Sequence, residues 1–315
     1  MSAAVLQCLH MVLALALAPA LTGVVRVTKA RLLGRQGPSV WQPYRDLARL
    51  LRKETVVAEN ASWLFLAAPY LVFSVIWLAA SLVPSFTLAL WLGPAADLIA
   101  LVALLAGARF FTALAGMDVG TSFGGIGASR EMMIATLAEP AMLMVIFTLS
   151  LWIGSTSLAH IAGVILARDL GVQVSLAMAL AAMLMVAVAE NARIPVDNPA
   201  THLELTMVHE AMVLEYSGRH LALIDAAAML KLLVYLSLIL CLFAPWGLAP
   251  AGAGPLDLAA AMSAYILKLM AGGVALGVFE VSIAKMRVFR VAEFLGGALL
   301  IAVLATIFLY VARAL

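Results

Sequence analysis

The composition of this 315-residue chain indicates a lipid environment: 65% of its residues are hydrophobic, 11% are charged, and its formal net charge is +2. A mean hydropathy of +1.10 excludes a water-soluble globular domain, and the nearly balanced charge gives no sign of a nucleic-acid partner. Only helices satisfy the backbone inside lipid, so apolar runs of about twenty residues predict an all-α, polytopic membrane protein. We expect one transmembrane domain over 1–315, with eight spans at 3–25, 63–83, 91–114, 132–153, 172–189, 221–246, 258–281 and 291–311.

The distribution of Lys and Arg predicts the orientation. Fifteen of the 19 lie in the connections after the first, third, fifth and seventh spans, where we place Arg26 to Lys53, Arg109 with Arg130, Arg193 with Arg219, and Lys285 to Arg290. By the positive-inside rule these connections are cytoplasmic. Both termini then lie on the outer side, as an even number of spans requires.

The first cytoplasmic connection, 26–62, is long and basic. Its leucines from position 47 to 51 recur at helical spacing, whereas Arg45, Arg49, Arg52 and Lys53 point elsewhere, which predicts a short amphipathic helix on the membrane surface. Two interpretations stay open: attraction to lipid headgroups, and docking of an acidic cytoplasmic partner. Two X-Pro pairs fix the shape of the segment, which a simple electrostatic anchor would not need.

The second cytoplasmic connection, 115–131, is rich in glycine. It fails as a dinucleotide-binding loop, because a third glycine at the required spacing and a preceding strand are both missing. We expect a tight connection whose backbone approaches another surface. Ser129 is expected to cap the following helix, and Glu131 to lie in its first turn, where the helix dipole favours an acid.

The third cytoplasmic connection, 190–219, is acidic. Pro195 and Pro199 break the helix after Glu190, so we expect Arg193 and Asp197 in an irregular segment, which is tolerated at membrane depth only where it lines a cavity or meets protein. Acids beside an apolar helix cost solvation energy unless they carry protons, ions or a partner's contacts. The acids of this connection are Glu190, Asp197, Glu204, Glu210 and Glu215.

Ionisable residues also occur inside the predicted spans, where they are functional by default. Glu139 precedes Pro140, which frees a backbone carbonyl and favours a wet pocket, so we interpret Glu139 as part of a proton relay. Lys231 and Lys268 fall near the middle of the bilayer and each needs a carboxylate to stay charged. The candidate partners are Asp97, Glu139 and Glu190, and Glu280 is a further intramembrane acid.

Sequence spacing gives little support for a metal site or for catalysis. His202, Glu204, His209 and Glu210 do not form an HExxH pattern, and no ligand set for a cofactor is visible. The two cysteines lie far apart in apolar spans and form no CxxC motif. We therefore expect no catalytic residue, metal or cofactor in this chain.

Three spaced motifs carry a family resemblance. The segment ENARIPVD at 190–197 with the later Glu204, the EYSG at 215–218, and Arg35 followed by Gly-Pro and Gln42 together resemble the subunit 1 family of respiratory complex I, the NADH-quinone oxidoreductase. The same pattern occurs in its relatives, the group 4 membrane-bound nickel–iron hydrogenases. The forms GPSVWQPYRD in the first connection and DVGTSFGGIGASRE in the second are similar to the hydrogenase branch, which includes formate hydrogenlyase.

The resemblance implies a non-catalytic, proton-conducting coupling subunit and membrane anchor in the cytoplasmic membrane of a bacterium or archaeon. The implied partners are hydrogenase large and small subunits and iron–sulfur subunits on the cytoplasmic face, with antiporter-like subunits in the lipid bilayer. Iron–sulfur clusters and the nickel–iron centre would reside in those partners.

The resemblance and the buried charges together divide the candidate residues into two groups. Proton-relay candidates are Asp97, Glu139, Glu190, Asp197, Glu204, Glu215, Lys231, Lys268 and Glu280. Residues expected to face the peripheral arm are Arg35, Arg45, Asp46, Arg130, Glu131, Arg193, Glu210 and Arg219. Two other functions stay open: a wall of a quinone chamber in an NADH-quinone oxidoreductase, and an inert anchor.

Overall fold

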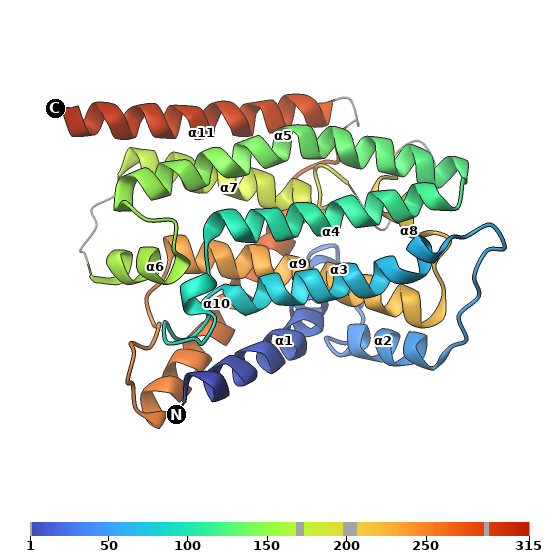
Figure 1. Ribbon diagram of the computed structural model, residues 1–315, viewed down its shortest axis with the longest axis horizontal. Coiled ribbons are helices and arrows are strands. Elements are labelled where there is room, and N and C mark those ends of the chain that lie inside the picture. Colours follow the sequence, from blue (N-terminus) through green and yellow to red (C-terminus); the bar gives the residue numbers. More distant parts are fainter. Residues whose placement is uncertain (1, 168–172, 198–206, 287–289, 315) are drawn as a thin grey trace.

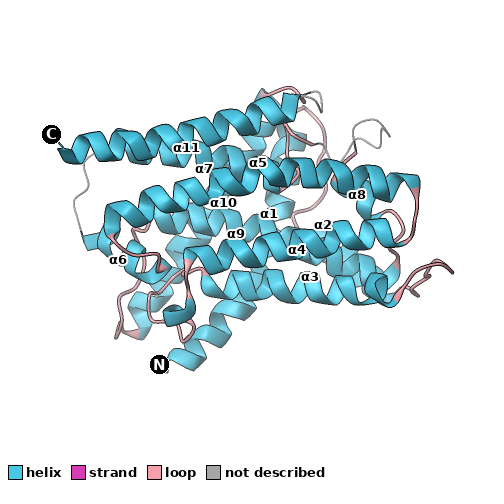
Figure 2. Cartoon of the chain, turned by 45° about the horizontal axis from the view of Figure 1, so that its top comes forward, coloured by secondary structure: helices cyan, strands magenta, loops and turns pink. Residues whose placement is uncertain are grey.

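The computed structural model describes residues 2–167, 173–197, 207–286 and 290–314, and in these ranges the regular structure is helical (Figures 1 and 2). The long helices run side by side along the longest axis of the molecule. The helices are α1 (Ala3–Leu32), α2 (Gln42–Arg52), α3 (Trp63–Leu82), η1 (Gly93–Ala95), α4 (Leu98–Asp118), α5 (Ser122–Ile153), α6 (Leu158–Ala167), α7 (Val174–Glu190), α8 (His209–Val213), α9 (Gly218–Phe243), α10 (Pro255–Ser282) and α11 (Val291–Ala314).

Seven of the described helices are long and apolar enough to cross a membrane: α1, α3, α4, α5, α9, α10 and α11. The predicted fifth span corresponds to α7, which has 17 residues and a length of about 26 Å at 1.5 Å per residue. This apolar helix packs against α5 and α11. The all-α polytopic fold is therefore confirmed, with seven full-length spans and one shorter apolar helix among the described residues.

The helices form one bundle around a continuous apolar core. α3 packs against α4 and α9 in its middle, α11 lies on α5 and α7 at one edge, and α1 pairs with α10 at the other (Figure 1). Both termini lie at the same end of the long axis, and α2 and α8 lie toward the opposite end. We call these the terminal end and the connection end.

Helix starts differ from the predictions where a capping residue lies upstream of the apolar run. α5 begins at Ser122, because Thr121 accepts a hydrogen bond from the Gly124 amide. The glycine-rich segment 115–131 is thus mostly helix, and only 119–121 connects α4 to α5. The predicted cap at Ser129 is wrong, since its hydroxyl donates to the Ile126 carbonyl, and Glu131 lies in the third turn of α5.

The connection end is held together by contacts between segments far apart in the sequence. The Ser62 hydroxyl donates to Asp118 at the end of α4 over 2.7 Å, and the Val56 amide donates to the Ser217 hydroxyl over 2.8 Å. Phe65 and Tyr216 stack with ring centroids 4.0 Å apart. The first connection contains α2, as its spacing predicted, although α1 continues as far as Leu32.

Candidate functional site

Arg109 lies at the centre of a buried group of charges. Its Nε is 3.5 Å from Glu131, its Nη1 is 3.0 Å from Glu139, and its Nη2 contacts Glu190. One guanidinium from α4 therefore joins two carboxylates of α5 to the last residue of α7. The prediction that Arg109 belongs to a cytoplasmic connection is wrong. Its position inside the predicted span 91–114 was the signal for an intramembrane charge.

Lys231 completes this group from α9. Its Nζ lies 3.2 Å from Glu190, so the predicted carboxylate partner of Lys231 is confirmed and is Glu190. Tyr235, one turn further along α9, is also buried. We call Arg109, Glu131, Glu139, Glu190 and Lys231 the central network. Three carboxylates facing two cations leave one carboxylate uncompensated by these cations, which favours the uptake of one proton.

A cavity of ≈ 70 Å³ adjoins the central network. Arg109, Glu131, Glu190 and Lys231 line it together with His209 of α8. This volume accommodates a few water molecules, and its polar lining supplies their hydrogen-bond partners. Burial, opposed by the charge of Glu210, lowers the pKa of His209, which therefore stays neutral near pH 7.

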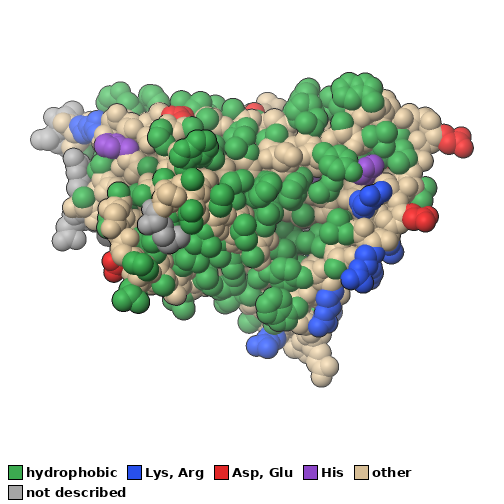
Figure 3. Space-filling view, turned by 60° about the horizontal axis from the view of Figure 1, so that its bottom comes forward, with side chains coloured by type: hydrophobic (Ala, Val, Ile, Leu, Met, Phe, Trp, Pro, Cys, Tyr) green, Lys and Arg blue, Asp and Glu red, His purple; other side chains and the backbone are tan. Residues whose placement is uncertain are grey.

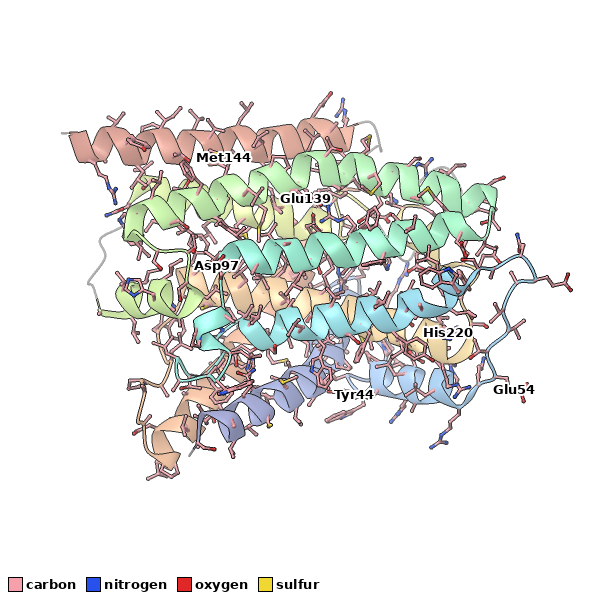
Figure 4. All side chains as sticks on the ribbon, in the orientation of Figure 1. Tyr44, Glu54, Asp97, Glu139, Met144 and His220 are labelled. Carbon is pink, nitrogen blue, oxygen red and sulfur yellow. The ribbon has the colours of Figure 1, made fainter. Side chains whose placement is uncertain are left out.

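The local sequence explains why Glu190 reaches this position. α7 ends at Glu190, the Asn191 side-chain amide donates to the Ala187 carbonyl, and Ala192 adopts a left-handed conformation with φ of 48°. The chain therefore turns away directly after Glu190, which stays buried beside α4 and α9. Figure 4 shows Glu139 near the middle of the long axis.

The segment after Glu190 enters a second group of ion pairs. Arg193 lies 3.5 Å from Glu280 of α10, and Lys29 of α1 lies 2.6 Å from the same carboxylate. Asp197 is 3.4 Å from Lys285. The predicted irregular segment thus meets protein, and Arg193 contacts α10 of the same chain. Burial lowers the pKa of Arg193, and the Glu280 carboxylate opposes this shift.

Two predicted relay residues, Asp97 and Lys268, lie apart from both groups of charges. Asp97 caps α4 by accepting from the Ile99 and Ala100 amides and from the Thr156 hydroxyl. It lies toward the terminal end (Figure 4), twelve residues or about 18 Å along α4 from Arg109.

Lys268 is the other relay candidate that lies apart. Its Nζ donates to the carbonyls of Ala244 and Trp246, at 3.0 and 2.7 Å, and lies 4.7 Å from the centre of the Trp246 ring. The predicted carboxylate partner of Lys268 is wrong, because carbonyls after the end of α9 and an aromatic face hold this ammonium instead.

The remaining predicted residues lie mainly on the surface of the connection end. Glu204 and His202 lie outside the described residues. The Arg130 guanidinium donates to the Met207 carbonyl over 2.8 Å, and Asp46 accepts from Gln42 and Arg49 at 3.0 Å. Glu210 is half-buried in α8, and the exposed members of the set are Arg35, Arg45, Glu215 and Arg219. Within the described ranges no group of three His, Cys, Asp or Glu side chains is placed to hold a metal ion.

Known proteins share this sequence pattern over nearly the whole chain. The pattern of the NADH dehydrogenase family matches residues 4–311. The chain belongs to the NADH dehydrogenase family. This match confirms the resemblance to the subunit 1 family of complex I.

Formate hydrogenlyase subunit 4 of Escherichia coli K12 is 36% identical over 273 residues, covering 86% of this chain and 87% of that protein. Hydrogenase-4 component C of the same organism is 34% identical over 259 residues, covering 82% and 80%. Among solved structures, a chain of the membrane-bound sulfane sulfur reductase, an archaeal respiratory membrane complex, superposes with a TM-score of 0.84. That chain is 18% identical, with coverage of 96% and 98%, so it supports the fold.

Proposed function

We propose that this chain is the membrane-embedded coupling subunit of a membrane-bound nickel–iron hydrogenase complex in the cytoplasmic membrane of a bacterium or archaeon. Two relatives above 30% identity, a formate hydrogenlyase subunit and a hydrogenase-4 component, align with more than 80% of the chain. The motifs of the first two connections resemble the same branch. The proposal makes this chain a non-catalytic subunit that conducts protons.

The central network is the observation that carries the proton-conducting part. Glu190 touches both cations, Arg109 and Lys231, and Arg109 also touches Glu131 and Glu139. A proton that arrives at one carboxylate weakens its pairing with Arg109, which strengthens the pairing of the others. Water in the adjoining cavity would connect Glu131 and Glu190 to His209 at the connection end.

We assign the redox chemistry to partner subunits. The hydrogenase large and small subunits and iron–sulfur subunits would dock at the connection end, and antiporter-like subunits would lie beside the bundle in the bilayer. Arg35 and Arg219 are exposed at that end and would contact the arm. The iron–sulfur clusters and the nickel–iron centre would be held by those subunits, and the charge they carry would act on the central network from outside the chain.

Charge-neutralising substitutions test the relay. Glu190→Gln and Glu139→Gln are expected to abolish hydrogen-coupled proton translocation in sealed vesicles, because each removes one proton-binding site next to Arg109. Hydrogen turnover with a soluble electron carrier should be retained. Glu59→Gln, at an exposed carboxylate of the first connection, is the matched control and should pump normally. Intact translocation in both network variants would show that the relay does not pass through these residues.

The identity of the complex is tested by purification. We expect a tagged chain, extracted in mild detergent, to bring down a hydrogenase large subunit together with bound nickel. Flavin and NADH-oxidising subunits without nickel would instead assign the chain to an NADH-quinone oxidoreductase. The cavity beside Arg109 is ≈ 70 Å³, well below the roughly 300 Å³ at which small-molecule sites begin, so the described residues of this chain do not by themselves form a quinone-sized cavity there.

A further inference from the structure

α2 presents a row of cations around an open hollow. Arg45, Ala48, Arg49 and Arg52, with the C-cap Lys53, line this shallow and widely open depression, which we call the α2 hollow. The helical residues recur every three or four positions and so share one face of α2. Figure 3 shows Lys and Arg gathered toward the connection end of this side of the molecule, next to a broad apolar surface.

The charge of this hollow is poorly compensated within the chain. Asp46 is 3.0 Å from Arg49. In the part of the chain that the structure describes, Arg45, Arg52 and Lys53 have no carboxylate within the 4.0 Å of an ion pair. Three cations on two turns of one helix create a local positive potential, which attracts an anion from outside the chain.

Contacts with α1 fix the depth of α2. Gly23 packs directly on the Val40 carbonyl, and the Tyr44 hydroxyl donates to the Ala16 carbonyl. Gly23 lies nine residues, or about 14 Å, before Leu32 at the end of α1. α2 therefore begins level with the apolar part of α1 and ends beside the first turn of α9, where the Glu54 carbonyl meets Gly218.

This depth selects the kind of anion. Trp41, just before α2, has 62% of its surface exposed and lies 5.4 Å from the Tyr44 ring. Trp and Tyr concentrate where acyl chains meet headgroups. Arg45 follows Tyr44 directly, and Arg49 lies one helical turn further. Both would then stand at the level of the lipid phosphates, and the acyl chains of the same lipids could lie along the apolar surface. An acidic loop of a cytoplasmic protein could reach Arg52 and Lys53 but not the aromatic pair.

We propose that the α2 hollow is a binding site for the headgroup of an anionic phospholipid. Arg45 and Arg49 hold the phosphodiester, Arg52 and Lys53 attract it from the cytoplasmic side, and Trp41 borders the first segment of the acyl chains. Bound lipid would complete the seam between α1, α2 and α9 in the assembled complex.

The test compares lipid retention in three forms of the full chain with its co-purifying partners. The hollow variant carries Arg45→Gln, Arg52→Gln and Lys53→Gln. The control variant removes the same charge from exposed residues outside the hollow, Arg31→Gln, Arg290→Gln and Arg313→Gln. Each preparation is exchanged into nanodiscs of phosphatidylcholine with a minority of phosphatidylglycerol, extracted again, and its phospholipids are quantified per mole of chain by mass spectrometry.

The hollow variant should retain at least about fivefold less phosphatidylglycerol per mole of chain than the wild type, since each cation near the surface contributes about 1 kcal/mol to anionic lipid binding. Phosphatidylcholine should be unchanged, and the control variant should match the wild type. A charge-conserving variant, Arg45→Lys with Arg52→Lys, should keep most of the retention. Equal retention of phosphatidylglycerol by the hollow variant and the wild type would overturn the proposal. If the hollow variant instead lost a cytoplasmic subunit while its lipid retention stayed unchanged, the α2 cations would bind protein and the proposal would also be wrong.

Discussion

At the scale of single residues, Arg109 has a task that another cation performs poorly. Each of its three nitrogens lies within ion-pair distance of a different carboxylate. A lysine at 109 would keep the charge but has one nitrogen in place of a fork. Removing the charge leaves Glu190 with Lys231 alone and leaves Glu131 buried without its cation.

We therefore expect Arg109→Gln to lower the free energy of unfolding by about 3–5 kcal/mol, the cost of breaking a buried ion pair. Arg109→Lys should fall between this variant and the wild type. Arg49→Gln is the control, because its ion pair with Asp46 is largely exposed and contributes at most about 1 kcal/mol. Thermal melting in detergent, followed by circular dichroism, measures all three. Equal melting of Arg109→Gln and Arg49→Gln would contradict the buried position of Arg109.

His209 makes stability depend on pH. Burial lowers its pKa from the usual 6.5, so the unfolded chain binds a proton that the folded chain rejects. As pH falls below 6.5, protonation favours the unfolded state, and the contribution of His209 to stability is lost. We expect the melting temperature of His209→Gln to fall less than that of the wild type between about pH 7 and 5. Parallel pH curves for the two proteins would show that folding does not lower the pKa of His209.

At the scale of helices, the sequence predicted the spans well because hydropathy senses the bilayer over about twenty residues. It predicted helix starts less well. Thr121 starts α5 eleven residues before the predicted span, because capping extends a helix through Gly124 and Gly127 without any apolar signal. α6 lies between the predicted spans 132–153 and 172–189, in a segment that we expected to be a connection on the outer side. With ten residues, α6 is too short to cross a membrane.

The site was predictable in its members but not in its pairings. Glu139, Glu190 and Lys231 stood out as charges in apolar runs. Which of them meet depends on how α4, α5, α7 and α9 pack, and hydropathy carries no information about that. Lys268 shows the consequence: backbone carbonyls after α9 satisfy it, and the sequence did not reveal these acceptors.

α1 packs closely on the segment just before α2, where Gly23 faces the Val40 carbonyl. A Cβ at Gly23 would overlap the Val40 carbonyl oxygen, so Gly23→Ala should push the two segments apart and destabilise the chain by about 1–3 kcal/mol. Gly107→Ala on α4 is the matched control. Nothing lies within 4 Å of a Cβ there, so the gain in helix propensity should keep or slightly raise stability.

Limited proteolysis of the first connection separates the two glycine variants. The Gly23→Ala chain should be cut faster between α2 and α3 than either the wild type or Gly107→Ala, because its α2 is no longer held against α1. Equal cleavage and equal melting of the two variants would show that α2 does not depend on this contact.

At the scale of the whole molecule, the bundle is polarised along its long axis. Both termini lie at one end, and the basic connections lie at the other (Figure 1). The positive-inside rule then predicts that the connection end is cytoplasmic and that the N-terminus is outside. This orientation matters for function, because it directs the His209 side of the central network toward the cytoplasm.

Thiol labelling tests this orientation directly. In a background with Cys8→Ser and Cys241→Ser, which removes both native cysteines, one variant carries Ser2→Cys and another Ser39→Cys. Both positions are exposed, at the terminal end and beside α2 respectively. A membrane-impermeant maleimide should label Ser2→Cys in intact spheroplasts and Ser39→Cys only in inside-out vesicles, while a permeant maleimide labels both. The reverse pattern would invert the topology, and His209 with the proposed docking surface would then face away from the cytoplasm.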